Sequence, residues 1–215
     1  MQFAAILAGG SGVRMGNPNK PKQFFYLGDK PILVHTLEKF CAAGCFDGIL
    51  VLTPATWVQQ TKDIIAKHCP QYADAVNVIA GGAERNDTIM NAIRYFEDEC
   101  QADDASVIVT HDAVRPFVSL RIIEDNIAAA LAHGACDTVV PATDTIVESL
   151  DGELISSIPN RSVLYQGQTP QSFNMRELRE TLESLTPEES AILTDACKAF
   201  VLQEGGPGAR RRVEH

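Results

Sequence analysis

Short β-like apolar runs alternate with helix-period segments through most of the chain, and this alternation limits the possible folds more than any other feature. It is typical of βαβ units, whose strands form a mostly parallel sheet with helices on both faces. The predicted strands are Phe3 to Leu7, Ile49 to Thr53, Val76 to Ala80, Val107 to Thr110 and Thr138 to Pro141. The sequence therefore predicts an α/β fold.

Three of the predicted helices carry recognisable start and stop residues. One begins at Pro31, which suits a first helical position, and stops at Gly44. A second follows Asp87, and a third begins after the N-cap candidate Ser119 and stops at Gly134. Because apolar residues recur at helical spacing in each segment, we expect each helix to pack one face against the sheet.

The composition excludes several classes of function. The 215 residues include 18 basic and 28 acidic side chains, a formal net charge of −10, which argues against nucleic acid or a membrane surface as partner.

No stretch approaches the roughly 18 apolar residues of a membrane span, and no signal peptide is visible. Six scattered cysteines without a C-x-x-C pair favour free thiols. We expect a cytoplasmic protein with one domain over residues 1–204.

The pattern changes after about residue 142. Two β-rich runs, Thr145 to Leu150 and Leu154 to Ile158, are joined by Asp151-Gly152, a strong turn signal. We therefore expect a projecting β-arm over about residues 142–172. Such an arm covers a site or meets a second subunit, and an ordinary surface hairpin is the alternative.

A glycine-rich segment, LAGGSGVRMG, directly follows the first predicted strand. Glycines there let backbone N–H groups approach phosphate oxygens, and Arg14 with Lys20 or Lys22 supplies positive charge. The dinucleotide pattern fails because Met15 occupies its last glycine position, and the P-loop pattern fails as well. Val13 likewise breaks the G-x-S-x-G hydrolase pattern. A structural turn is the alternative to a phosphate site.

The sequence PKQ follows this turn, so Arg14 and Lys22 can converge on one triphosphate. Two cations beside a reacting phosphorus stabilise the charge that develops in phosphoryl or nucleotidyl transfer. A solvated pair of surface charges is the alternative.

Two further polar loops follow predicted strands, where ligands bind in open α/β sheets. The first is Gly81 to Thr88, whose backbone suits the edge of a base, although Asn86 or Asp87 can equally be a helix N-cap. The second contains Asp112, a candidate Mg²⁺ ligand, and Arg115, which can hold Asp112 or an anionic substrate. We interpret the neighbouring His111 as structural.

Six segments together, LAGGSGVRMG, PKQF, GGAERNDTIMNAI, HDAVRPF, DTIVES and YQGQTPQSFNM, resemble the cytidylyltransferases that make CDP-activated polyols. The resemblance runs from the first residues to about Ala199 with the motifs in the family's order. The family has a 2-C-methyl-D-erythritol 4-phosphate branch and a ribitol-5-phosphate branch. Four segments are closer in sequence to the ribitol-5-phosphate branch: THDAVRPF, DTIVES, YQGQTPQSFNM and LTDACK.

The resemblance implies a Rossmann-like nucleotide-diphosphosugar-transferase fold and the reaction of CTP with D-ribitol 5-phosphate to give CDP-ribitol and pyrophosphate, for teichoic-acid or capsule-type polymers. It implies Arg14 and Lys22 as catalytic residues at the α-phosphorus, and Asp112 as the ligand of Mg²⁺ or another divalent cation. It implies that Arg115, Thr145 and Arg161 bind the polyol phosphate, with the arm completing the partner's site in a homodimer. The implied CTP-binding residues are Leu7, Ala8, Gly9, Gly10, Gly12, Gly82, Ala83, Glu84, Arg85, Asn86, Asp87, Thr88 and Asp112.

The C-terminal part departs from the family. After the helix containing Leu193 to Lys198, members continue into a strand, a lysine-containing stretch and a closing helix. Here residues 205–215 are rich in Gly and Arg without periodicity, and we expect a disordered or aberrant tail. Since the family's lysine helps position the substrate phosphate, a CTP-binding form with weak activity stays an alternative. So does the methylerythritol branch, whereas the failed dinucleotide pattern disfavours a nicotinamide-dependent reductase.

Overall fold

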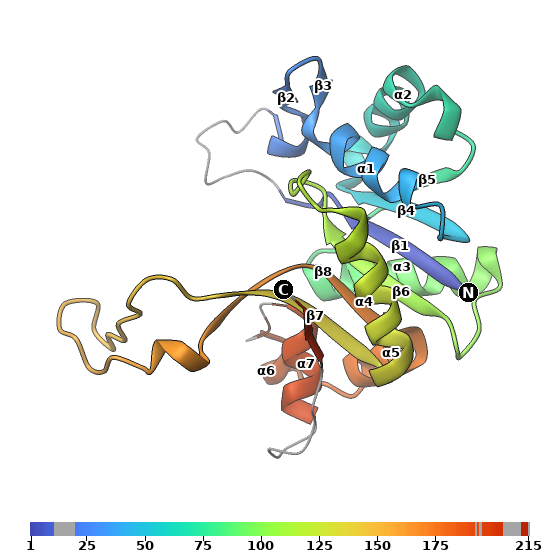
Figure 1. Ribbon diagram of the computed structural model, residues 1–215. Coiled ribbons are helices and arrows are strands. Elements are labelled where there is room, and N and C mark those ends of the chain that lie inside the picture. Colours follow the sequence, from blue (N-terminus) through green and yellow to red (C-terminus); the bar gives the residue numbers. More distant parts are fainter. Residues whose placement is uncertain (11–19, 192, 194, 204–211, 215) are drawn as a thin grey trace.

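The computed structural model describes residues 1–10, 20–191, 193, 195–203 and 212–214. Its centre is a seven-stranded sheet of order β5-β4-β1-β6-β8-β7-β9 (Figure 1). Its strands are β1 (Gln2–Leu7), β4 (Gly48–Thr53), β5 (Val76–Ala80), β6 (Val107–Asp112), β7 (Ala135–Pro141), β8 (Tyr165–Asn174) and β9 (Arg212–Glu214). The pairs β5-β4, β4-β1, β1-β6 and β7-β9 are parallel, whereas β8 runs antiparallel to β6 and β7. The α/β prediction and its five strands are confirmed.

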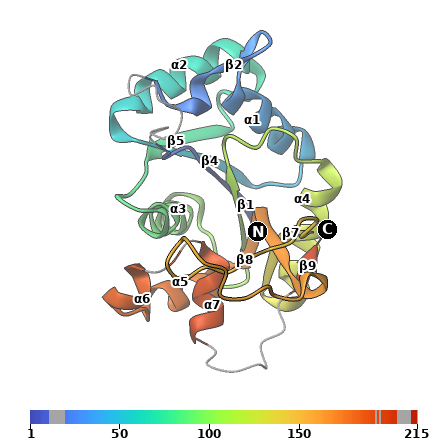
Figure 2. The same ribbon diagram turned by 90° about the vertical axis from the view of Figure 1, so that its left-hand side faces the viewer.

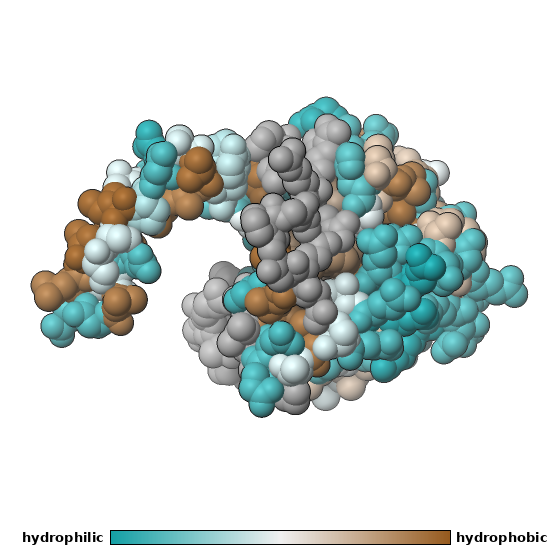
Figure 3. Space-filling view, turned by 90° about the horizontal axis from the view of Figure 1, so that it is seen from below, coloured by the Kyte–Doolittle hydropathy of each residue, from teal (hydrophilic) through white to brown (hydrophobic). Residues whose placement is uncertain are grey.

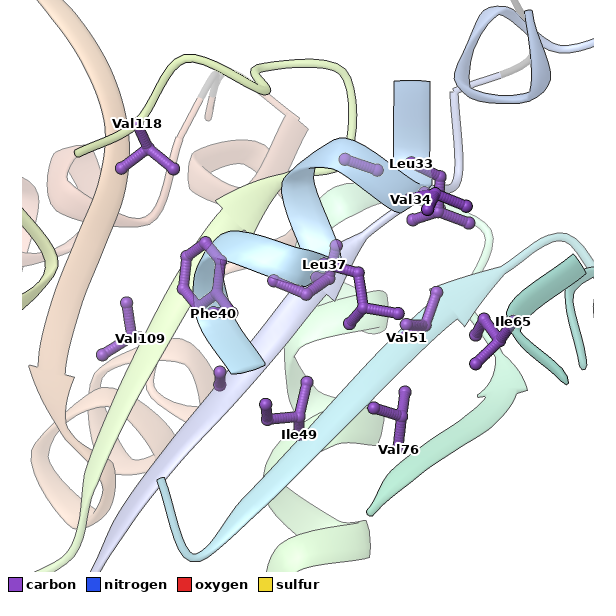
Figure 4. Packing of buried hydrophobic residues seen from close by; sticks show 14 of the residues in the cluster. Leu33, Val34, Leu37, Phe40, Ile49, Val51, Ile65, Val76, Val109 and Val118 are labelled. Atoms are coloured by element: carbon purple, nitrogen blue, oxygen red, sulfur yellow. The ribbon is translucent and has the colours of Figure 1, made fainter. Parts of the chain in front are cut away.

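Helices cover both faces of this sheet, and each face has its own apolar core (Figure 2). On one face lie α1 (Ile32–Ala43), α2 (Val58–His68) and α4 (Leu120–His133), on the other α3 (Arg85–Cys100), α5 (Met175–Glu183) and α7 (Ala196–Gln203). Figure 4 shows the first core, where Leu37 and Phe40 of α1 point at Val51 and Val109 of the sheet. Buried aliphatic side chains of this kind each contribute about 1.5–3 kcal/mol, which fixes the helices on the sheet.

The remaining elements are short. They are η2 (Lys22–Phe24), β2 (Tyr26–Leu27), β3 (Lys30–Pro31), η3 (Ala55–Trp57), η4 (Pro70–Tyr72), η5 (Arg161–Val163) and α6 (Pro187–Ala191). β2 and β3 form a separate antiparallel pair. None of the helices in the described ranges combines the length and the apolar character needed to cross a bilayer.

The predicted helix boundaries match local capping geometry. Gly44 ends α1 in the left-handed region with φ 64°, which a glycine adopts without strain. The Ser119 side chain accepts a hydrogen bond from the N–H of Ile122, so it is the N-cap of α4. α3 begins at Arg85, earlier than predicted, because Glu84 and Asp87 form a capping box around its first turn.

The arm is present, but its limits and its internal structure differ from the prediction. It spans residues 143–164, and the N–H of Ala142 bonds to the carbonyl of Leu164 at its base. The two predicted arm strands are wrong, since the only pairing within these residues is an isolated bridge between Glu148 and Ser157. A lone hairpin with no layer to pack against is marginal. Residues 165–172 belong to β8, because they pair with β7 and β6 instead.

The C-terminal segment also differs from the expectation for residues 205–215. Arg212–Glu214 form β9, which pairs in parallel with residues 136–138 of β7. The physical reason is that β7 would otherwise be a sheet edge with unpaired backbone groups. The rest of the expected tail, 205–211 and 215, lies outside the described residues.

Candidate active site

A cavity of about 370 Å³ lies at the C-terminal ends of β1 and β6, beside the N-terminus of α3. The two strands are paired in parallel with Leu7 opposite Asp112, so the loops that follow them meet at one edge of the sheet. The predicted residues that line the cavity are Leu7, Ala8, Gly9, Gly10, Lys22, Gly82, Ala83, Glu84, Arg85, Thr88 and Asp112. Gln23 and Val114, which the sequence did not single out, line it too.

Other predicted residues lie elsewhere. Asn86 and Asp87 are in the first turn of α3, Arg115 is beside the cavity, and Thr145 and Arg161 are on the exposed arm. Gly12 and Arg14 lie outside the described residues, so the predicted convergence of Arg14 with Lys22 stays a prediction.

Asp112 is the electrostatic centre of the site. Its Oδ1 accepts a hydrogen bond from Nη1 of Arg85 at 2.8 Å, and its Oδ2 accepts one from Nε of Arg115 at 3.0 Å. Burial alone would raise the pKa of Asp112, but the two guanidinium groups outweigh it, and the pKa lies below its usual value. The carboxylate is therefore ionised at neutral pH and holds two cations at the edge of the cavity.

Arg115 connects this centre to β8. Its Nη1 donates to Oε1 of Gln168, and the N–H of Asp112 donates to Oγ1 of Thr169 at 3.3 Å. Arg115 thus holds Asp112, one of the two roles that its position suggested. The other role, binding an anionic substrate, stays a prediction.

His111 lies completely buried beneath this loop, against the ring of Phe40 at a centroid distance of 5.0 Å. Its Nε2 lies 3.0 Å from the carbonyl oxygen of Arg115, so a neutral imidazole with its proton on Nε2 donates to that carbonyl. Burial lowers its pKa to about 4. The imidazole is therefore uncharged at neutral pH and supports the loop from below, which agrees with the structural role predicted for it.

Lys22 and Lys20 differ in their position relative to the cavity. Lys22 lines the cavity, whereas Nζ of Lys20 lies over the ring of Tyr26, 5.6 Å from its centroid. Cation–π attraction accounts for the orientation of Lys20. Among the described residues, Lys22 is therefore the lysine placed to meet a phosphate in the cavity.

The loop from Gly82 to Glu84 is folded tightly against the first turn of α3. The N–H of Gly82 donates to Oγ1 of Thr88 at 3.0 Å, and that hydroxyl donates to the carbonyl of Glu84 at 2.9 Å. A Cβ on Gly82 would lie 2.1 Å from Cβ of Asp87, a distance no side chain tolerates. The N-cap of α3 is Glu84, so the predicted N-cap at Asn86 or Asp87 is wrong; Asp87 takes part in capping from the third helical position, where its Oδ2 accepts a hydrogen bond from the N–H of Glu84.

The arm carries the remaining predicted residues away from this cavity. Nη1 of Arg161 donates to the carbonyl of Thr143 at 2.6 Å, and Thr145 is exposed. Figures 1 and 2 show the arm extending from the β7–β8 end of the sheet, away from the helices. The structure of one chain therefore does not bring Thr145 and Arg161 together with Lys22.

The fold is of the Rossmann-like α/β class, and its cavity brings glycines, a lysine and an arginine-bound aspartate to the carboxyl edge of a mostly parallel sheet, an arrangement that suits a nucleotide phosphate. Comparison with known proteins specifies the family. The chain belongs to the 2-C-methyl-D-erythritol 4-phosphate cytidylyltransferase family, whose sequence model matches residues 3–208.

One curated relative and two solved structures are similar to this chain. It is 52% identical over 198 residues to the ribitol-5-phosphate cytidylyltransferase of Lactiplantibacillus plantarum, covering 92% of this chain and 84% of the relative. The crystal structure of 4-diphosphocytidyl-2C-methyl-D-erythritol synthase from Anaerococcus prevotii is similar with a TM-score of 0.78 and 24% identity, covering 100% of this chain and 86% of that one. The 2-C-methyl-D-erythritol 4-phosphate cytidylyltransferase of Francisella tularensis has a TM-score of 0.78 and 25% identity, with 99% and 89% covered.

Proposed function

We propose that this protein transfers CMP from CTP to D-ribitol 5-phosphate, releasing pyrophosphate and forming CDP-ribitol, a precursor for teichoic-acid or capsule-type polymers. The observation that carries the proposal is the 52% identity to a ribitol-5-phosphate cytidylyltransferase over nearly the whole chain. The solved structures named for the methylerythritol substrate are 24% and 25% identical. Methylerythritol 4-phosphate is therefore the second candidate acceptor.

The proposed reaction is a direct displacement. An oxygen of the acceptor's phosphate attacks the α-phosphorus of CTP in line, the new P–O bond forms, and the bond to the bridging oxygen of the β-phosphate breaks with its electron pair leaving on pyrophosphate. The attacking phosphate is already ionised, so no general base is required. Lys22, with Arg14, would neutralise charge at the α-phosphorus, and the backbone from Leu7 to Gly10 would bind the triphosphate.

Magnesium fits the residues at the cavity edge. Mg²⁺ is commonly held by one or two carboxylates together with substrate phosphates and water. A carboxylate has about four lone-pair directions, and the two arginines use one on each oxygen of Asp112. Asp112 can therefore hold the ion, which would supply neutralisation of the phosphate oxygens. Within the described part of the chain no group of three or more His, Cys, Asp or Glu side chains converges on a metal position, so phosphate oxygens would complete the coordination.

A second copy of the chain is the proposed partner of the arm. Hydrophobic residues lie exposed on the projecting arm (Figure 3). Leu150, for example, is 85% exposed. Exposed apolar surface of this kind marks an interaction site. The arm's exposed apolar residues are Ile146, Val147, Leu150, Leu154, Ile155, Ile158 and Val163. Docking of the arm on a partner would bring Thr145 and Arg161 toward the partner's acceptor phosphate. We place the reaction in the cytoplasm, where CTP is available.

Pyrophosphate release tests the proposed function. Purified protein is incubated with Mg²⁺, CTP and either ribitol 5-phosphate or methylerythritol 4-phosphate, with UTP as the nucleotide control. We expect ribitol 5-phosphate and CTP to give the highest kcat/KM. A higher kcat/KM with methylerythritol 4-phosphate would instead assign that acceptor substrate to this protein. CTP binding without turnover of either acceptor would instead favour the weakly active form that the C-terminal segment suggests.

A further inference from the structure

Gln23 lines the cavity with its side chain buried rather than exposed to the ligand space. Only 1% of the residue is exposed, and its Nε2 donates to the carbonyl oxygen of Ala8 at 2.6 Å. Ala8 follows β1 and is itself held, because its N–H donates to the carbonyl of Leu52 in β4 at 2.8 Å. One buried side chain thus ties two stretches 15 residues apart, at the floor of the cavity.

The turn that carries Gln23 also carries Lys22. Both belong to η2, whose backbone bonds run from Phe24 to Pro21 and from Phe25 to Lys22, each at 3.1 Å. Such a one-turn element has few bonds of its own, and long 3₁₀ runs are uncommon for that reason. Its position must therefore come from anchors outside it.

Two side chains anchor η2 from outside, beside the backbone bond from the N–H of Ile32 to the carbonyl of Phe25 at 2.9 Å. The ring of Phe24 is buried and stacks on Trp57 with centroids 4.9 Å apart, which holds one side of the turn on the apolar core. Gln23 holds the cavity side through Ala8. Apolar stacking fixes depth but permits sliding, whereas a hydrogen bond to a carbonyl fixed by the sheet defines one position.

We infer that Gln23 is a positioning residue for Lys22, locking its turn to the end of β1 so that the backbone from which the lysine side chain extends keeps one position relative to the α-phosphorus. This inference rests on the proposed function for its effect on turnover. Catalytic groups misplaced by about 1 Å lose on the order of 100-fold in rate, so the bond would act on kcat more than on nucleotide affinity.

The test uses two substitutions at this position and one matched control. Gln23→Glu keeps the shape but sets a carboxylate against the Ala8 carbonyl, and Gln23→Met removes the donor without adding charge. Gln60→Glu makes the same chemical change at an exposed position of α2. We expect both Gln23 variants to lower kcat by at least 20-fold with the Kd for CTP changed less than about threefold, and Gln60→Glu to change neither.

A double-substitution cycle separates positioning from general disturbance. In a Lys22→Ala background, Gln23→Met should lower kcat by less than about twofold, because the group it positions is gone. An equal loss in both backgrounds would overturn the inference. If Gln23→Glu did not fold, Gln23→Met would serve alone in the comparison of kcat with the Kd for CTP.

Hydrogen exchange gives a readout that needs no activity. In Gln23→Met the amides of Phe24 and Phe25 should exchange at least tenfold faster than in the Gln60→Glu protein, while amides of α1 keep their rates. Unchanged exchange at these two amides would overturn the inference. If the wild-type chain turned over no polyol phosphate, the proposed function would fall, and this measurement would still decide whether Gln23 fixes the turn.

Discussion

Substituting Asp112 by Asn removes the charge that holds two arginines at the cavity edge. The Arg85 pair is partly buried, with side-chain exposures of 29% and 25%, so we assign it about 1.5 kcal/mol. The Arg115 pair involves a side chain that is 42% exposed, so solvent screening reduces it to about 0.5 kcal/mol. The expected loss in the free energy of unfolding is therefore about 2 kcal/mol. For a chain of this length that corresponds to a fall in Tm of about 4–8 °C.

Thermal melting at pH 7 measures this loss against a matched control. Asp125→Asn breaks the pair with Arg121, whose side chain is 65% exposed, and should lower Tm by less than about 2 °C. A Tm difference of about 1 °C is roughly the smallest that this comparison resolves. If the Tm of Asp112→Asn lay within that difference of the Tm of Asp125→Asn, the two guanidinium contacts would contribute nothing to stability and the reasoning would be refuted.

The pH dependence gives a second check on Asp112. Arginine contacts lower its pKa in the folded state below the reference value of 3.8. A lowered carboxyl pKa contributes stability that is present above the unfolded pKa and is lost as the pH falls through the folded pKa. The Tm difference between wild type and Asp112→Asn should therefore be constant from about pH 8 to pH 5 and shrink below about pH 4.

Three further predictions concern the cavity and its surroundings. Lys22→Ala should lower kcat about 100-fold or more while the Kd for CTP, measured by calorimetry, rises less than about fivefold, and equal losses in both would contradict a transition-state role. Gly82→Ala should lower Tm by several degrees because its Cβ would meet Asp87, whereas Gly10→Ala, whose Cβ would have no atom of the described residues within 4 Å, should melt like wild type; equal Tm values would refute the steric argument. Burial raises the pKa of Asp137 to about 6, so wild type loses stability as the pH rises from about 4 through 6. Asp137→Asn should melt higher than wild type at pH 8 and equally at pH 4, and a lower Tm at pH 8 would count against the burial of this charge.

The sequence predicted those strands and helix ends that are determined by residues close together in the chain. Five strands and the caps at Gly44 and Ser119 follow from apolar runs and terminal residues in a single stretch of sequence. β8 was missed because residues 165–172 were assigned to the arm, and its strand conformation depends on pairing with β6 and β7. The two arm strands were overpredicted for the opposite reason, since Asp151-Gly152 makes a turn without any surface for the flanking runs to pack on.

The cavity was predictable because its loops all follow parallel strands, whose carboxyl ends must meet. The contacts that organise it were not. The Arg85–Asp112 pair joins residues 27 apart, and the Gln23–Ala8 bond joins residues 15 apart. No sequence pattern indicates that residues this far apart in the chain are bonded. One signal was available for Gln23: it directly follows the candidate catalytic residue Lys22, and a polar residue in that position can support its neighbour.

The acidic composition can now be reconciled with a polyanionic substrate. A net charge of −10 opposes the approach of a triphosphate, so binding depends on local potential rather than on the total. Asp112 is itself acidic, yet its position between two arginines makes that local group of three side chains positive by one charge. A carboxylate at the cavity edge therefore contributes to anion binding indirectly, by fixing guanidinium groups that would otherwise repel each other. Nucleotide affinity should accordingly fall in Asp112→Asn even though the substitution removes a negative charge from the cavity.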